Sequence, residues 1–184
     1  MKQKIIKTAL KHFAINGYKN TSMQDIAEEL NITKPALYYH FKNKNDLYNA
    51  IFIYYFSKLK FNISSDIFKD LEHYIDTLDN FFKKESLLAK LLSKEISCKF
   101  RNLNKESVSI ISKMIQALNK ILKGTNINPF FIQNLIISSF TTYLNTMEIR
   151  KKITSLITCC EISSEFDLKK ELILTITNYI KAKQ

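Results

Sequence analysis

The stretch TSMQDIAEELNITKPALYYHFKNKNDL, residues 21–47, decides how the rest of this sequence is interpreted. Its apolar residues recur at helical spacing in two short runs, which the turn Asn31-Ile32-Thr33 separates. Thr21 is expected to cap the first run as a helix, with Gln24 three residues later, and Thr33 to cap the second. Two short helices joined by a tight turn are typical of a helix-turn-helix.

The second short helix is expected to present a polar and aromatic outer face. Pro35 falls in its first turn, where proline costs no hydrogen bond. Burial of Leu37 and Phe41 would leave the outer surface to Lys34, Tyr38, Tyr39 and His40. An exposed helix of this kind can enter a major groove, where lysine can reach guanine and hydroxyls can reach phosphate.

Helices are also expected on both sides of this pair. Residues 2–16 have an amphipathic pattern that Asn16-Gly17 ends, with Gly17 suited to a left-handed conformation. Asn43 is expected to cap a fourth helix that continues to about Ile63. Such a helix would be ~30 Å long and would connect the small domain directly to the next one.

The segment around residues 5–50 resembles the tetracycline-repressor (TetR) family. The resemblance rests on Phe13-Ala14, Gly17-Tyr18, Thr21-Ser22-Met23 and Asp25-Ile26-Ala27, followed by the run from Ile32 to Leu47. It implies an all-α protein with a helix-turn-helix DNA-binding domain over 1–46 and a helical ligand-binding and dimerisation domain over 47–184. It also implies a homodimer that represses transcription from a palindromic operator and releases it when a small, apolar effector binds.

The same resemblance assigns DNA contacts residue by residue. It implies phosphate contacts for Thr21, Tyr38, Tyr39, His40 and Lys44, and it places Thr33, Lys34 and Pro35 at or beside the bases. Pro35 stands where many family members carry a smaller residue, so the operator sequence is not inferred. With Ser22, the expected DNA-binding set is Thr21, Ser22, Thr33, Lys34, Pro35, Tyr38, Tyr39, His40 and Lys44.

Composition supports a helical, basic protein of 184 residues with a formal net charge of +11. Only two glycines are present, which disfavours hairpins and excludes phosphate-cradling glycine loops. Residues 1–60 hold ten lysines against four acidic residues, which favours a polyanionic partner such as double-stranded DNA. Because most of the cations are lysines, a coding bias that makes many surfaces basic is the competing explanation.

Several classes of function find no support in the sequence. No nucleophile elbow, dinucleotide fingerprint or metalloprotease spacing is present, so no enzyme activity, cofactor or metal is expected. Cys98, Cys159 and Cys160 have no metal-ligand spacing and fit a reducing cytoplasm. No run of apolar residues is long enough to cross a membrane. A cytoplasmic location is therefore expected.

The C-terminal part has helical periodicity near 66–84, 86–100 and 105–123, where Gly124 ends it. Asn128-Pro129 then begins a helix that is apolar nearly all round, and Ser164 is expected to cap a last helix of similar character. Residues 149–163 fit either a continued helix or a loop. Burial between two subunits would explain such faces, and it predicts an interface of Phe130, Ile137, Phe140, Leu144, Leu172, Ile176, Tyr179 and Ile180.

An effector pocket is the least defined expectation. Aromatic and apolar residues in the middle of the chain could line it, although such residues more often serve packing: Phe81, Phe82, Phe100, Met114 and Tyr143. Two other functions stay open at this stage. A helical interaction module could bind an acidic protein or a membrane surface through its lysines, and a helical enzyme would need titratable groups that converge in a pocket.

Overall fold

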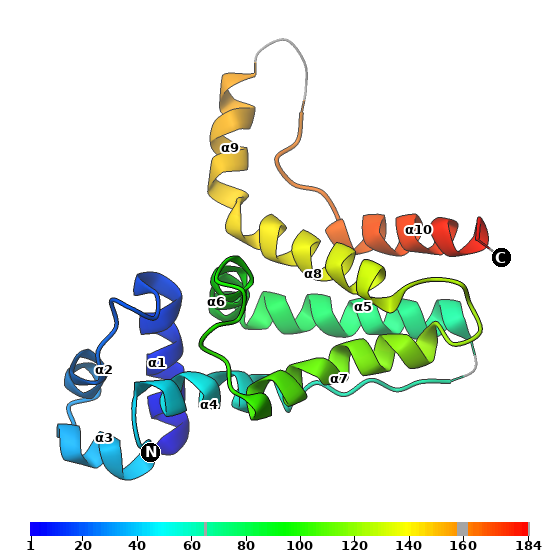
Figure 1. Cartoon of the computed structure of the whole chain (residues 1–184). Helices are drawn as coiled ribbons and strands as arrows, with labels where there is room; N and C mark the ends of the chain where they lie inside the picture. Colours follow the sequence, from blue (N-terminus) through cyan, green and yellow to red (C-terminus); the bar gives the residue numbers. More distant parts are fainter. Residues whose placement is uncertain (65, 158–161, 184) are drawn as a thin grey trace. The chain divides into compact units, whose positions relative to one another are not determined.

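In the computed structural model, residues 1–64, 66–157 and 162–183 are described, and all regular structure in these ranges is helical (Figure 1). The expected all-α fold is confirmed. The helices are α1 (Lys2–Asn16), α2 (Met23–Glu29), α3 (Lys34–His40), α4 (Lys44–Phe56), α5 (Ile67–Lys84), α6 (Ser86–Ser97), α7 (Lys105–Ile121), α8 (Pro129–Asn145), α9 (Met147–Leu156) and α10 (Leu168–Lys181).

The chain forms two compact units. The first combines Met1–Lys60 with Lys90–Lys113, and the second combines Phe61–Ala89 with the chain from Met114 onward. Helices α6 and α7 therefore each contribute residues to both units. The division by function into residues 1–46 and 47–184 stays a proposal.

The first unit is built around α1, which packs against α2 and α4, while α2 also packs against α3. Buried apolar side chains of these helices, among them Ile5, Phe13, Ile26 and Leu37, form its core. Helix α1 ends at Asn16, as its pattern predicted, because Gly17 adopts a positive φ of 81°. Asn31 ends α2 in the same way, with a φ of 53°.

Helix α4 is shorter than the sequence predicted. It ends at Phe56 rather than near Ile63, so its length is ~20 Å. The backbone amide of Leu59 donates to the carbonyl of Phe56, which tightens the last turn. Phe61 then stacks on Tyr74 of α5 with ring centroids 4.7 Å apart. The chain gains this aromatic contact by leaving the helical path, and the prediction of one long connecting helix was wrong.

The second unit has a core formed by α5, α8 and α10, which pack against one another. Helix α8 begins as predicted, with Asn128 accepting a hydrogen bond from the amide of Phe130 and Pro129 in the first turn. The start of α10 was predicted wrongly. Asp167, not Ser164, is its N-cap and accepts from the amide of Lys170 at 3.1 Å.

The ambiguous segment 149–163 is helical in its first part, because α9 extends to Leu156. Cys159 and Cys160 lie outside the described residues, while Cys98 is a free and exposed thiol. Among the described residues, no helix is both long and apolar enough to span a lipid bilayer.

Candidate nucleic-acid interface

Helix α3 is anchored by a single buried side chain. Leu37 is fully buried, and Phe41, which follows the helix, is buried too, so the predictions for these two residues are confirmed. Thr33 caps the helix as predicted, accepting a hydrogen bond from the amide of Ala36 at 3.3 Å. The outer face is open, and the side chain of Tyr39 is 86% exposed. Helix α3 is thus held from beneath and leaves its polar face free.

The cap of α2 differs from the prediction by one residue. Ser22 is the N-cap: its hydroxyl accepts from the amide of Asp25, and its own amide donates to the Asp25 carboxylate at 2.9 Å. The hydrogen bond from the Ser22 amide to this carboxylate, together with the nearby Ser22 side chain, holds the pKa of Asp25 below its ordinary value. Thr21 is buried, and its hydroxyl donates to the carbonyl of Gly17 at 2.9 Å. The prediction that Thr21 caps α2 was wrong, because its hydroxyl is used inside the domain.

Lys44 ties the start of α4 to the corner between α1 and α2. Its ammonium group donates to the carbonyl oxygens of Tyr18 at 2.9 Å and Thr21 at 3.1 Å. The same group lies 4.5 Å from the centre of the Tyr18 ring. Lys44 therefore stabilises the fold locally and also leaves a positive charge near the surface beside α2.

A hollow of about 390 Å³ lies next to α3, and Lys44 is one of the residues that line it. We call it the basic hollow; it is lined by Lys19, Asn20, Thr21, Ser22, Met23, Gln24, Lys34, Tyr38 and Lys44. Three of these residues are lysines and none is acidic, so its potential favours an anion such as phosphate. It brings together five of the predicted DNA-binding residues: Thr21, Ser22, Lys34, Tyr38 and Lys44.

The other four predicted DNA-binding residues lie outside the basic hollow. Thr33 and Pro35 are exposed at the start of α3, while Tyr39 and half-buried His40 are at its end, with their rings edge to face at 5.3 Å. The sequence interpretation missed Lys19 among the hollow's residues. Its position two residues after Gly17 and two before Thr21 was the available signal, because that turn brings it to the start of α2.

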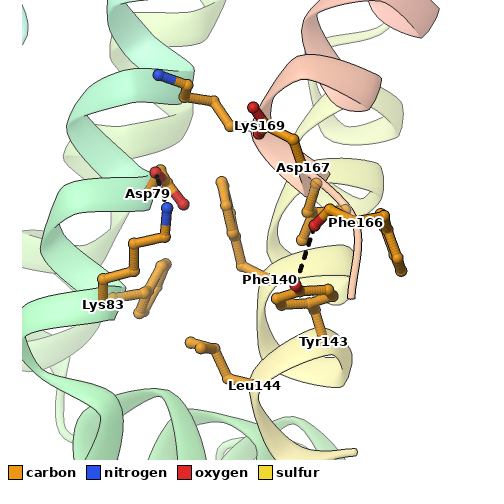
Figure 2. A pocket seen from close by; sticks show the side chains of 10 residues that line it. Asp79, Lys83, Phe140, Tyr143, Leu144, Phe166, Asp167 and Lys169 are labelled. Carbon is orange, nitrogen blue, oxygen red and sulfur yellow. Dashed lines mark hydrogen bonds and ion pairs between the residues drawn. The ribbon is translucent and has the colours of Figure 1, made fainter. Parts of the chain in front are cut away.

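A second hollow, of about 230 Å³, lies in the second compact unit (Figure 2). We call it the α5–α8 hollow. Tyr143 closes one side by donating from its hydroxyl to the carbonyl of Phe166 at 3.0 Å, and Lys83 pairs with Asp79 at 2.7 Å on another. Its lining residues are Asp79, Phe82, Lys83, Phe140, Tyr143, Leu144, Phe166, Asp167, Leu168 and Lys169.

Two of the five residues predicted for an effector pocket, Phe82 and Tyr143, line the α5–α8 hollow. Phe81 does not line it, although it contacts the Phe82 ring. Met114 is buried, and its carbonyl accepts from Tyr74. Phe100 belongs to the other compact unit.

Most residues predicted for the dimer interface are core residues of a single subunit. These are Ile137, Phe140, Leu172, Ile176 and Ile180, all buried where α5, α8 and α10 meet. The apolar faces of α8 and α10 are thus largely covered within the chain, which corrects the sequence interpretation for these five. Leu144 is half-buried and lines the α5–α8 hollow. Phe130 and Tyr179 are exposed, and Tyr179 lies beside exposed Phe131, with ring centroids 5.3 Å apart.

Comparison with known proteins agrees with this geometry. Residues 5–51, which include α1, α2, α3 and the first part of α4, match the family described as "Bacterial regulatory proteins, tetR family". Over this segment the chain is similar to TetR-family regulators.

Curated relatives match over segments of similar length. The probable acrEF/envCD operon repressor of Escherichia coli K12 is 40% identical over 52 residues, which are 28% of this chain and 24% of the repressor. The biofilm operon icaADBC regulator IcaR of Staphylococcus epidermidis is 46% identical over 48 residues, which are 26% of each chain. The chain thus matches about a quarter of the length of these relatives, both of which are named as repressors or negative regulators.

Solved structures of regulators extend the likeness to the fold of the remaining chain. FadR from Bacillus subtilis, solved with stearoyl-CoA, has a TM-score of 0.67 at 15% identity and covers 100% of both chains. The TetR-family regulator PfmR from Thermus thermophilus has a TM-score of 0.66 at 20% identity, over 79% of this chain and 85% of its own. At these identities the likeness concerns the fold alone.

Proposed function

We propose that this protein is a transcriptional repressor that binds a palindromic DNA operator as a homodimer. The observation that carries the proposal is the open outer face of α3 beside the basic hollow. Lys34 and Tyr38 belong to both, so one approach of a DNA duplex would bring bases to α3 and phosphates to the hollow. We place this activity in the cytoplasm, where bacterial DNA is found.

The palindrome follows from the proposed two-fold symmetry. Two copies of α3 would enter successive major grooves on one side of the duplex, ~34–36 Å apart. Phe130, Phe131 and Tyr179 offer exposed apolar surface on α8 and α10, which supports pairing through these helices.

A small effector would release the DNA. The α5–α8 hollow has aromatic walls, from Phe82, Phe140 and Tyr143, and charged residues of both signs at its edge, such as Asp79 and Lys83 (Figure 2). These features favour a mainly apolar molecule with a polar end. The effector must bind the DNA-free state more tightly than the DNA-bound state, typically by about 1–3 kcal/mol.

The DNA part of the proposal is tested by selecting duplexes from a random library with the full chain and measuring affinity by fluorescence anisotropy. Lys34→Ala should relax the base preference at one position in each half-site, since lysine there reads base edges. Tyr39→Phe should weaken binding to all sequences by about 2–10-fold, since it removes one phosphate hydrogen bond. Neither variant touches the core, so thermal unfolding should stay unchanged.

Lys60→Ala is the matched control, because Lys60 is an exposed lysine of the same compact unit that does not line the basic hollow. It should bind like the wild type. Selected duplexes without two-fold symmetry would contradict the palindromic operator. Equal affinities for wild type, Lys34→Ala and Tyr39→Phe would contradict the use of α3.

The effector part is tested by a thermal-shift screen of small apolar acids, amines and alcohols, followed by anisotropy with the selected duplex. Compounds that stabilise the protein should also release DNA. Leu144→Trp should fill the α5–α8 hollow and abolish both effects without lowering DNA affinity. Release that persists in this variant would place the effector elsewhere.

A further inference from the structure

A third hollow, of about 270 Å³, lies within the first compact unit and contains a buried carboxylate. It is formed where the end of α1, the middle of α4 and the second half of α6 come together. Its lining includes Gly17, Tyr18, Tyr48, Leu91, Glu95 and Asn102. We call it the Glu95 hollow. None of these residues has a part in the DNA contacts or in the effector pocket proposed above.

Glu95 is only 2% exposed, and its two carboxylate oxygens differ in their partners. Oε1 accepts a hydrogen bond from the hydroxyl of Tyr48 at 2.6 Å and another from the side-chain amide of Asn102 at 3.0 Å. Oε2 is buried without a hydrogen-bond partner among the residues that the structure describes. Burial and the bond to Glu95 raise the pKa of Tyr48, so the tyrosine keeps its proton and acts as the donor.

No cation of the described chain compensates this carboxylate at ion-pair distance. Lys94, the residue before Glu95, also lines the hollow, but its ammonium group donates to the carbonyl of Ile15 at 2.9 Å. A buried charge without a partner is costly, and the cost falls when a cation with N–H donors meets it. A cation with N–H donors should therefore bind in the Glu95 hollow more tightly than a neutral molecule of the same shape.

We propose that the Glu95 hollow binds a small organic amine, whose apolar part lies against Tyr18, Tyr48 and Leu91 and whose ammonium group pairs with the Glu95 carboxylate after a small rotation of that side chain brings Oε2 to the hollow. A metal ion fits the lining less well. Besides Glu95, Cys98 is the one His, Cys, Asp or Glu side chain among the residues that line the hollow, and the described residues hold no group of three such side chains. The Glu95 hollow shares no lining residue with the α5–α8 hollow, and binding of an amine there does not require DNA.

The experiment uses the full chain, with benzylamine as the probe and benzyl alcohol as its uncharged match. Both are titrated at pH 7 by calorimetry and by thermal shift. Benzylamine should bind at least 10-fold more tightly than benzyl alcohol. Glu95→Gln, which keeps an oxygen for Tyr48 and Asn102 but removes the charge, should lose this preference. Glu106→Gln, at an exposed acid of α7 in the same unit, should keep it.

Without any ligand, Glu95→Gln should unfold at a higher temperature than the wild type, because the uncompensated charge is gone. Benzylamine should reduce this difference in unfolding temperature, because it should stabilise the wild type and not the variant. The proposal is overturned if neither compound binds the wild type, if both bind equally, or if Glu95→Gln retains the preference for the amine. The first two outcomes are read on the wild type alone and do not depend on how the variant folds. Because the readout is ligand binding, it is independent of the operator.

Discussion

The ammonium group of Lys44 donates to the backbone carbonyl of Tyr18 at 2.9 Å and lies 4.5 Å from the centre of the same residue's ring. A lysine expected from the sequence to hold phosphate therefore also holds the corner between α1 and α2. The two roles predict different effects of a substitution. Loss of a phosphate contact would weaken DNA binding and leave the stability of the fold unchanged, whereas loss of the hydrogen bonds to the backbone would lower that stability.

We predict that Lys44→Ala lowers the free energy of unfolding by about 1–3 kcal/mol, through loss of charged hydrogen bonds to two carbonyls. Denaturant unfolding followed by circular dichroism measures this change. Lys42→Ala is the matched control, at an exposed lysine two residues earlier, and should stay within about 0.5 kcal/mol of the wild type. Equal stability of the two variants would show that the contacts of Lys44 contribute little to the fold.

Asn49 of α4 is the centre of a buried polar network. Its amide group donates to the carbonyls of Asn45 and Asn102 at 2.8 and 3.0 Å, and its oxygen accepts from the Asn104 amide at 2.7 Å and the Ser107 hydroxyl at 2.6 Å. We predict that Asn49→Ala costs about 2–4 kcal/mol in chemical denaturation, because several buried groups lose their partner. Asn45→Ala, at an exposed position, should cost less than half as much.

Glu29 of α2 makes the stability of this unit depend on pH. Hydrogen bonds from Lys11 at 2.9 Å and from the His12 ring at 2.7 Å hold the pKa of Glu29 below its ordinary value of 4.5. A carboxyl with a lowered folded pKa stabilises the protein above the unfolded value, and the contribution disappears as the pH falls through the folded value. At neutral pH, Glu29→Gln should therefore have a lower melting temperature than the wild type. Well below pH 4.5 the two proteins should have the same melting temperature.

Glu28→Gln is the control for this pH experiment. Glu28 is exposed on the same helix and accepts a hydrogen bond from Gln24 rather than from a cation. Its melting temperature should follow that of the wild type across the whole range. A difference between Glu29→Gln and the wild type that is independent of pH would show that charge is not the cause.

The exposed aromatic cluster of α8 and α10 gives a test of the proposed homodimer. We predict that Phe131→Glu yields a folded monomer in light scattering after size exclusion, because its ring is 50% exposed in one chain and packs beside Tyr179. Phe140→Glu, at a residue only 2% exposed, should instead unfold the second unit, as seen by circular dichroism. A wild-type protein that remains monomeric at micromolar concentration would contradict the dimer.

Local patterns predicted the N-terminal helices well because their ends are decided by a few adjacent residues. Gly17 and Asn31 end α1 and α2 through positive φ angles, and Thr33 and Asn43 cap the helices that follow them. The residues that resemble the TetR family lie in this segment, so the outer face of α3 could also be predicted.

Errors arose where distant residues decide the outcome. Helix α4 ends early as Phe61 turns toward Tyr74. The error at Thr21 has a local cause, because its hydroxyl donates to the carbonyl of Gly17, four residues earlier, and is not free to cap α2. The apolar faces of α8 and α10 were assigned to a partner, whereas α5 covers much of them within one chain. The Asn49 network joins residues more than fifty positions apart, and no local spacing indicates it.

Residues 90–113 complete the first compact unit, although in the sequence residues 61–89, which include α5, separate them from residues 1–60. Tyr48 and Asn49, both on α4, form hydrogen bonds with Glu95, Asn102 and Ser107 of this later segment. A graft of the first sixty residues onto another protein of this fold would leave these polar groups without their partners. Exchange of DNA specificity between such regulators is therefore simplest by substitution on the face of α3, not by moving the whole N-terminal segment.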